Sequence, residues 1–205
     1  ILSPHQVPIC DEWFSMNDLE LNFIESINVD KSKLPVGWKF ESSRPYLTSF
    51  EKLSGDRLSF EREIFDADAV IFGSGDYSLI KERIAADKLT FIYSERIYKN
   101  WREWVKYPYH CIKFRKMYGR SNSVYLLCAS AFSSADYNRL GLFRNKTFKW
   151  GYFPRTEVID KSLTQKEAYK ESVRILWCAR FIPLKHPELA IMLAKRLKNE
   201  GYNFC

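Results

Sequence analysis

From about Asp68 onward, short runs of β-branched and aromatic residues alternate with segments of helical composition. This alternation is typical of βα units, in which helices connect the strands of a parallel sheet. We expect a helix over residues 77–86 and strands over residues 69–73, 89–94 and 123–130, with another strand from Thr147. The pattern therefore predicts an α/β fold built on a Rossmann-like parallel sheet.

Serine and glycine residues mark the expected start and end of the helix in the last of these units. Ser133 and Ser134 are the expected N-cap of a helix that runs to Leu140, because a serine hydroxyl can accept from free N–H groups of the first turn. Gly141 is the expected stop of that helix, since glycine readily adopts the left-handed conformation found there. Pro154 is expected to end the strand that follows.

The rhythm breaks over residues 153–172, a polar stretch with a capping-box pattern at Ser162 and Gln165. Beyond it we expect a strand over residues 173–179, a loop, and a helix over residues 187–200 that begins at Pro187 and stops at Gly201. One face of this helix carries Leu189, Met192, Leu193 and Leu197. We therefore expect a Rossmann-like N-terminal domain over residues 1–160, and a linker with the first βα unit of a second Rossmann-like domain over residues 161–205.

Both ends of the chain look like interrupted strands, at residues 1–6 and 202–205. A second Rossmann-like domain needs more βα units than residues 173–205 can supply, so we expect a fragment of a longer protein. The alternative is a complete domain with a βαβ appendage.

Composition argues against a disordered, a membrane-spanning or an exported protein. The sequence is 46% hydrophobic and 28% charged, which is a globular balance. It lacks an apolar run of roughly 18 residues and a signal-peptide pattern, so we expect a cytoplasmic protein with reduced cysteines. His5, His110 and His186 show no metal-ligand spacing, and no metal is expected. The net charge of +7 indicates an anionic partner, which is nucleic acid, the phosphates of a nucleotide or lipid, or an acidic membrane.

Three stretches carry a resemblance to a known family. Residues 175–191, ILWCARFIPLKHPELAI, are similar to the opening of the donor-binding domain of glycosyltransferase family 4, in which an arginine follows the strand and a lysine lies five positions on. Here these are Arg180 and Lys185. Residues 3–14, SPHQVPICDEWF, and residues 124–141, VYLLCASAFSSADYNRLG, resemble elements of the family's first domain. The resemblance implies a retaining, two-domain (GT-B) glycosyltransferase that uses a nucleotide-diphosphate sugar without a metal.

The chain departs from the family pattern at several positions. Ala179 and His186 stand where glycines are common, and Ser94, Glu95 and Arg96 stand where a histidine is frequent. No histidine role is therefore carried over. The family's glutamate pair would lie beyond Cys205.

The chemistry suits Arg180 and Lys185, because negative charge grows on the leaving diphosphate when the sugar is transferred. Arg180 offers a planar fork for phosphate oxygens, Lys185 offers a point charge, and both precede a helix N-terminus. The alternative is a solvated loop with two basic residues.

In open α/β sheets, ligands bind beyond the carboxyl ends of the strands. The turns after Gly73 and Ser94 would lie there, which makes Ser74, Asp76, Glu95 and Arg96 candidates for contacting the acceptor. Glu95 is the candidate base or orienter, and the alternative is an ion pair with Arg96 or another surface charge. The leaving phosphate is thought to help deprotonate the acceptor in retaining enzymes, so a base is not strictly required.

Two short motifs are not interpreted as binding sites. The glycines of residues 73–75 lack the third glycine of a dinucleotide fingerprint, since Ser78 stands there, and indicate a tight turn. Asp66 and Asp68 have the spacing of a metal-binding carboxylate pair but precede their strand, at the wrong end of the sheet.

Residues 101–120 are basic and aromatic, with Trp101, Trp104, Val105 and Ile112 near helical spacing and a helix start or kink expected at Pro108. One interpretation is a cationic face that meets a lipid-linked acceptor at an anionic membrane. The other is an amphipathic helix packed on the sheet, with solvated basic residues, which are Lys106, Lys113, Arg115, Lys116 and Arg120.

The predicted function is a hexosyltransferase that extends a bacterial cell-envelope polysaccharide. Its partners would be a nucleotide-diphosphate sugar, a glycan or lipid-linked acceptor, and the inner face of the membrane. The alternatives are a nucleic-acid-binding module that uses residues 101–120, and a sugar-nucleotide epimerase on the same fold.

Overall fold

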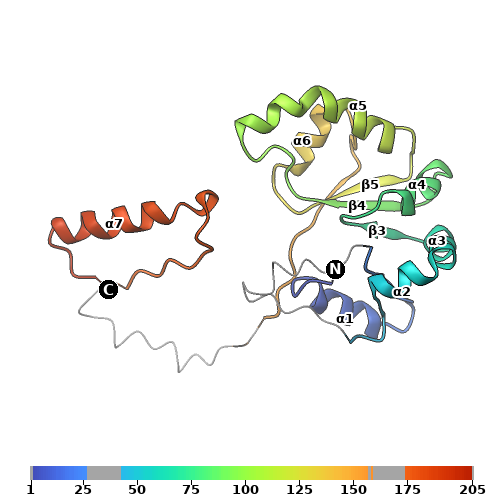
Figure 1. Ribbon diagram of the computed structural model, residues 1–205, viewed down its shortest axis with the longest axis horizontal. Coiled ribbons are helices and arrows are strands. Elements are labelled where there is room, and N and C mark those ends of the chain that lie inside the picture. Colours follow the sequence, from blue (N-terminus) through green and yellow to red (C-terminus); the bar gives the residue numbers. More distant parts are fainter. Residues whose placement is uncertain (1, 27–42, 157, 159–173, 205) are drawn as a thin grey trace. The chain divides into compact units, whose positions relative to one another are not determined.

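The computed structural model (Figure 1) describes residues 2–26, 43–156, 158 and 174–204. Its internal contacts divide the chain into two units, Ile1–Arg155 and Thr156–Cys205. The capping-box residues Ser162 and Gln165 lie outside the described residues. Unit 1 holds the strands that the structure describes, and the described part of unit 2 holds one short 3₁₀ helix and one α-helix.

Four parallel strands form the main sheet of unit 1. They lie in the order β3 (Val70–Phe72), β4 (Thr90–Ser94), β5 (Val124–Cys128) and β6 (Thr147–Lys149). The connections are α4 (Ser78–Ala85), the 3₁₀ helix η2 (Trp101–Lys106) followed by α5 (Tyr107–Tyr118), and α6 (Ser133–Arg139). The expected α/β fold with a parallel sheet is confirmed.

The register of the sheet places the strand ends along one edge. Phe72 pairs with Ile92, Ser94 pairs with Cys128, and Cys128 pairs with Lys149. All four strands run in the same direction, so the turns that follow β3 and β4 lie at the same edge of the sheet.

The two faces of the sheet are covered to different extents. One face packs against α5 and α6 (Figure 1), in a core that includes Ile80, Leu126 and Leu140, each at most 1% exposed. The other face carries an aromatic row in which neighbouring ring centroids lie 5.8 Å (Phe91–Tyr125) and 5.9 Å (Tyr125–Phe148) apart. Strand residues alternate between faces, so the apolar character of both follows from the near-continuous apolar runs in the sequence.

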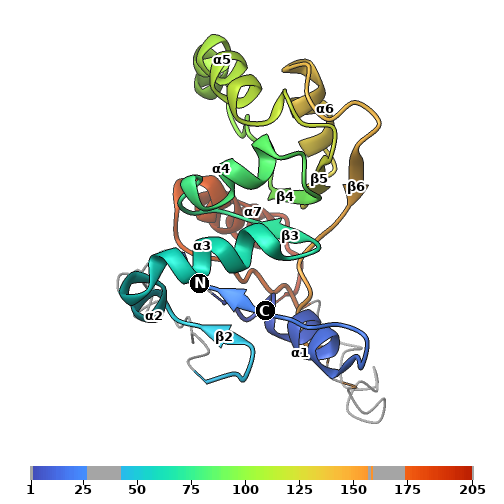
Figure 2. The same ribbon diagram turned by 90° about the vertical axis from the view of Figure 1, so that its right-hand side faces the viewer.

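A smaller layer precedes the main sheet. It contains α1 (Val7–Ser15), the short parallel pair β1 (Phe23–Ile24) and β2 (Leu47–Thr48), α2 (Phe50–Gly55) and α3 (Arg57–Asp66). A separate cluster of buried side chains stabilises its first part, and comprises Leu2, Val7, Cys10 and Tyr46. Figure 2 shows these elements on the β3 side of the sheet, with β6 at the far edge.

A buried arginine connects α3, α4 and the start of β4. Arg83 is 1% exposed, and its guanidinium donates hydrogen bonds to five main-chain carbonyls. The acceptors belong to the end of α3, the turn before β3 and the residue before β4, and are Ile64, Phe65, Ala67, Asp68 and Leu89. Two of these carbonyls have a second donor, since Phe65 also accepts from Lys88 Nζ at 2.9 Å and Leu89 also accepts from the Val70 N–H at 3.3 Å. Arg83 supplies the donor for the buried carbonyls of Ile64, Ala67 and Asp68.

Unit 2 contains the 3₁₀ helix η5 (Pro183–Lys185) and the helix α7 (Pro187–Asn199). Pro187 occupies the first turn and Gly201 has a φ of 78°, so the predicted start and stop of this helix are confirmed. The strand expected over residues 173–179 is wrong: residues 174–179 form no strand, and residue 173 lies outside the described residues. A strand is defined by hydrogen bonds to a neighbour, and the described part of unit 2 offers no second strand.

Three local predictions need correction. Phe132, not a serine, takes the N-cap position of α6, and Ser133 is the first helical residue. The Ser133 hydroxyl is buried and donates to the Ser94 carbonyl at 3.2 Å, so it connects α6 to β4 instead of capping the helix. β6 ends at Lys149, well before Pro154. Residues 2–6 form no strand, and residues 4–6 form a turn. The predicted stop at Gly141 is confirmed by its φ of 78°.

Candidate functional site

A pocket of about 490 Å³ opens at the carboxyl ends of β3 and β4. The turn after β3, the end of β4, and helices α5 and α6 all contribute to its wall. The polar side chains among its lining residues are Ser74, Tyr77, Tyr93, Ser94, Lys113, Tyr118 and Tyr137. This is the position at which open α/β sheets bind ligands.

Glycines shape the turn that forms the floor of this pocket. Gly75 has a φ of 140°, and a Cβ placed there would overlap the hydroxyl of Ser26. A Cβ at Gly73 would lie 3.4 Å from the ring of Tyr93. The predicted tight turn is confirmed, and its glycines let the main chain lie close to the pocket.

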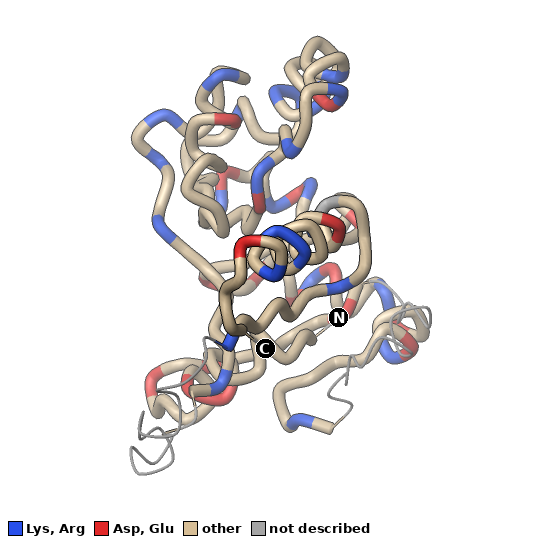
Figure 3. Tube along the Cα trace, turned by 90° about the vertical axis from the view of Figure 1, so that its left-hand side faces the viewer, with Lys and Arg blue, Asp and Glu red and all other residues tan. Residues whose placement is uncertain are grey.

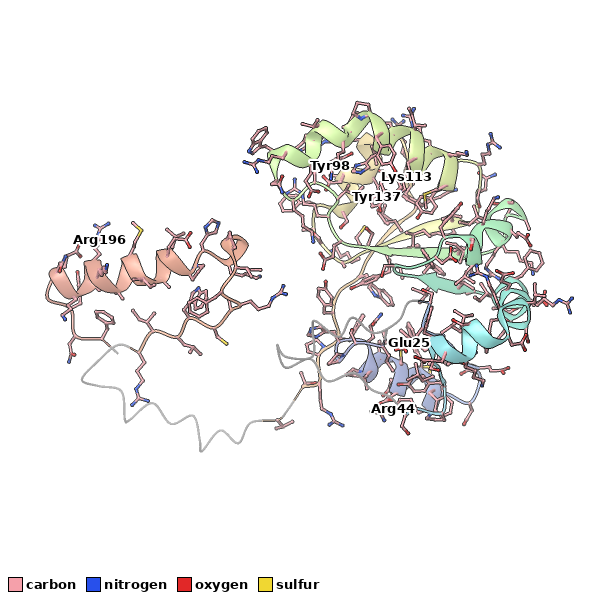
Figure 4. The ribbon with its side chains drawn as sticks, viewed as in Figure 1. Glu25, Arg44, Tyr98, Lys113, Tyr137 and Arg196 are labelled. Atoms are coloured by element: carbon pink, nitrogen blue, oxygen red, sulfur yellow. The ribbon has the colours of Figure 1, made fainter. Side chains whose placement is uncertain are left out.

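Tyrosines form much of the pocket wall. Tyr137 donates from Oη to the Ser94 hydroxyl at 3.1 Å, and Tyr77 donates from Oη to the Met117 carbonyl at 2.7 Å. Burial raises the pKa of both phenols, so they remain neutral and offer hydroxyls and flat rings. In Figure 4, Tyr137 of α6 lies beside Lys113 of α5, whose ammonium is the one Lys or Arg charge among the lining residues.

Glu95 is not among the residues that line the pocket. Its carboxylate pairs with the Lys99 ammonium and accepts a hydrogen bond from the Tyr152 hydroxyl. The hydrogen bond from Lys99, then that from Tyr152, lowers the pKa of Glu95, so the group is ionised at neutral pH. Tyr152 is also hydrogen-bonded to Tyr93, which lines the pocket. Glu95 is therefore connected to the pocket through two tyrosines.

Arg96 is engaged with a buried carboxylate. Its Nε lies 3.3 Å from Oδ2 of Asp136, which is fully buried and also accepts from the Tyr98 N–H at 3.3 Å. The Arg96 guanidinium also lies over the ring of Phe132, 4.8 Å from its centroid. Arg96 does not line the pocket, and its contacts stabilise the segment after β4 against α6.

Asp76 likewise has local partners. It accepts hydrogen bonds from the N–H and the hydroxyl of Ser78, at 2.9 and 2.7 Å, and pairs with Arg57 at 2.9 Å. The bonds from Ser78, followed by that from Arg57, lower the pKa of Asp76. Among the four residues expected to contact the acceptor, Ser74 alone lines the pocket.

Arg180 and Lys185 lie in unit 2, where both are exposed. Lys185 is the last residue of η5, and the Arg180 carbonyl accepts from the Ile182 N–H at 2.8 Å. Neither side chain forms an ion pair within the part of the chain that the structure describes. Both cations therefore remain accessible to an anionic ligand.

The N-terminus of α7 already holds an anion. The Glu188 carboxylate accepts from its own main-chain N–H and lies 2.8 Å from Nδ1 of His186, and these two contacts lower its pKa. Pro187, the first residue of the helix, contributes no N–H. A phosphate that binds at this helix end must compete with Glu188.

The residues that the structure describes contain neither a cluster of metal ligands nor a helix that could cross a bilayer. Within those residues, no three His, Cys, Asp or Glu side chains are grouped as a metal site would need. In the same part of the chain, no helix has the length and apolar character required to span a bilayer. Asp66 ends α3 and Asp68 lies before β3, at the amino end of that strand as expected.

The tyrosines of the site were missed by the sequence analysis. Tyr137 and Tyr152 reach their partners across 43 and 57 positions of the chain, and no local pattern indicates such contacts. Lys113 was noted, but as part of the basic segment and not as a pocket residue. No family model matches the chain, and neither the curated proteins nor the solved structures include a significant match.

Proposed function

We propose that the protein is a retaining glycosyltransferase of the two-domain GT-B kind, which moves a hexose from a nucleotide-diphosphate sugar to a glycan or lipid-linked acceptor in the cytoplasm. The observation that carries the proposal is the pocket at the carboxyl ends of β3 and β4, with its tyrosines, serines and one lysine. The resemblance of residues 175–191 to a donor-binding domain supports the proposed nucleotide-sugar donor.

The lining of the pocket suits a carbohydrate acceptor. Aromatic rings such as that of Tyr93 offer flat apolar surfaces for the C–H faces of a sugar, and neutral hydroxyls such as that of Ser74 can donate to or accept from sugar hydroxyls. Lys113 offers a positive charge for an acceptor that carries a phosphate. A few polar groups on an apolar wall are the usual composition of a small-molecule site.

The transfer step breaks the bond between the anomeric carbon and the diphosphate oxygen, and forms a bond from that carbon to the acceptor oxygen. The acceptor's proton passes to the leaving phosphate. Glu95 has a lowered pKa and is held by Lys99, so it accepts a proton poorly. We assign it an orienting role, in which it fixes the Tyr152 and Tyr93 hydroxyls.

The donor would be held by unit 2. In this proposal Arg180 grips phosphate oxygens with its planar fork, and Lys185 neutralises the charge that grows on the diphosphate. Two fixed cations can perform this task without a metal ion. Both are accessible in the structure, which is compatible with a ligand-binding role.

The test is a nucleotide-release assay on the full-length protein, with UDP-, GDP-, ADP- and CMP-sugars and a mixture of glycan acceptors. We expect release from one donor class, and a loss of at least about tenfold in kcat/KM for Lys113→Met or Tyr93→Phe. Lys52→Met, which removes an exposed lysine of α2 far from the lining residues, should leave the rate unchanged. Equal rates for all four proteins would place the acceptor elsewhere.

A further inference from the structure

The outward side of η2 and α5 exposes large apolar side chains. Trp101, Val105, Tyr109 and Ile112 follow one another at intervals of about one turn, and are 74%, 76%, 59% and 74% exposed. We call these four residues the outer stripe. A helix on the surface of a globular protein normally presents polar residues to water, so this composition needs an explanation.

Folding does not account for the outer stripe. The opposite side of α5 packs on the main core through Tyr107, Cys111, Phe114, Met117 and Tyr118. Trp104 stacks on Tyr98 with ring centroids 4.3 Å apart. The helix is therefore already held by its inner side, and the outer stripe adds apolar area that the described residues leave uncovered.

Basic side chains lie beside the outer stripe. Residues 101–120 contain six Lys or Arg and a single acidic residue, Glu103. The Arg102 guanidinium lies 5.6 Å from the centroid of a Trp101 ring, and the Lys113 ammonium lies 5.7 Å from that of Tyr109. Figure 3 marks the Lys and Arg positions along this part of the chain. The surface thus combines apolar area with a strong positive charge.

We propose that the outer stripe docks the protein on the surface of an anionic lipid membrane. Trp101 and Tyr109 have the amphipathic rings that are enriched at membrane–water interfaces. Val105 and Ile112 would enter the boundary between headgroups and acyl chains, and Lys106 and Lys116 would lie among the lipid phosphates. The helix lies on the membrane in this arrangement and does not cross it.

The composition favours lipid over the other possible occupants. Bases and phosphates of a nucleic acid would use the aromatic and basic residues, but not the exposed aliphatic side chains of Val105 and Ile112. A second copy of the chain would bring two positively charged faces together, which is unfavourable. An acyl-chain boundary beneath anionic headgroups matches both the apolar and the charged part of the surface.

The experiment is vesicle flotation of the full chain. We expect the protein to float with phosphatidylcholine vesicles that contain about 30 mol% phosphatidylglycerol, and not with pure phosphatidylcholine. Salt at roughly 0.5 M should weaken the binding, because it screens the electrostatic attraction. A folded protein that does not bind the anionic vesicles would overturn the inference.

Paired variants locate the surface. Val105→Ser with Ile112→Ser should lower the partition coefficient by about tenfold or more, and Lys106→Gln with Lys116→Gln by roughly tenfold to thirtyfold. The matched controls are Leu58→Ser, which replaces a 74% exposed leucine of α3, and Lys52→Gln with Lys81→Gln on α2 and α4. Circular dichroism confirms that each variant is folded.

Three results would contradict the inference. Controls that lose binding as strongly as the stripe variants would show that the attraction is diffuse. Binding of single-stranded RNA without vesicle binding would assign the surface to nucleic acid. A dimer that the serine variants dissociate, again without vesicle binding, would assign it to a second copy. The inference does not rest on the proposed function. A protein that floats with anionic vesicles but releases no nucleotide would support membrane docking and contradict the transferase proposal.

Discussion

At the scale of single residues, the carboxylates that follow β3 and β4 form ion pairs and hydrogen bonds with side chains of the same unit. Asp76 is held by Ser78 and Arg57, and Glu95 is held by Lys99 and Tyr152. The sequence indicated that both residues follow a strand, which is correct. It could not indicate that Arg57, 19 positions away, would pair with Asp76.

Asp76 is expected to contribute to the pH dependence of the free energy of unfolding. Its pKa is lowered in the folded state, so its stabilising contribution is present above the unfolded pKa of about 3.9 and is lost as the pH falls through the folded value. The side chain is 42% exposed, and solvent screening limits the effect of Asp76→Asn at neutral pH to about 1 kcal/mol or less. Urea unfolding at several pH values should show a shallower acid slope for this variant than for Asp18→Asn, an exposed control. Identical slopes would contradict the assignment.

Replacing Glu188 is expected to increase nucleotide affinity. Its carboxylate lies at the N-terminus of α7, where a donor phosphate would compete with it. Glu188→Gln should therefore raise the affinity for a nucleotide diphosphate by about twofold to fivefold, as measured by calorimetry. Glu200→Gln, at the other end of the helix, is the control. A decrease in affinity would mean that Glu188 itself helps to bind the nucleotide.

At the scale of elements, the strands of the main sheet were predictable because each is a run of β-branched and aromatic residues that is buried in a parallel sheet. The run at residues 174–179 has the same composition but forms no strand. Composition selects residues that can join a sheet, whereas a strand also requires a neighbour. The helices were predictable where proline or glycine marked their ends, as at Pro187 and Gly201.

Arg83 provides a test at this scale, because one side chain connects α3, α4 and β4. Arg83→Met would leave the carbonyls of Ile64, Ala67 and Asp68 without their donor, and we expect a loss of about 3 kcal/mol or more in the free energy of unfolding. Lys81→Met, an exposed position of α4, should change stability by less than about 0.5 kcal/mol. Urea denaturation followed by circular dichroism measures both. A mild effect at Arg83 would show that these carbonyls have other donors.

At the scale of the whole molecule, the sequence predicted the α/β class and the strand ends at which a pocket forms. It did not predict the pocket wall, because Tyr93, Tyr137 and Lys113 come together only when the helices α5 and α6 pack beside β4. It left open whether Trp101, Val105 and Ile112 would be exposed or packed on the sheet, since helical spacing is the same for an inner and an outer face. The domain boundaries and the transferase assignment remain predictions.

The central claim is that Arg180 helps to bind a nucleotide diphosphate, and the most direct test is calorimetric titration of the full-length protein with UDP, GDP and ADP, and with the monophosphate CMP for comparison. We predict saturable binding of one nucleotide, weakened about tenfold to a hundredfold by Arg180→Ala. Lys195→Ala, which removes an exposed charge of α7, should leave the affinity unchanged. A folded protein that binds none of the four nucleotides would contradict the account.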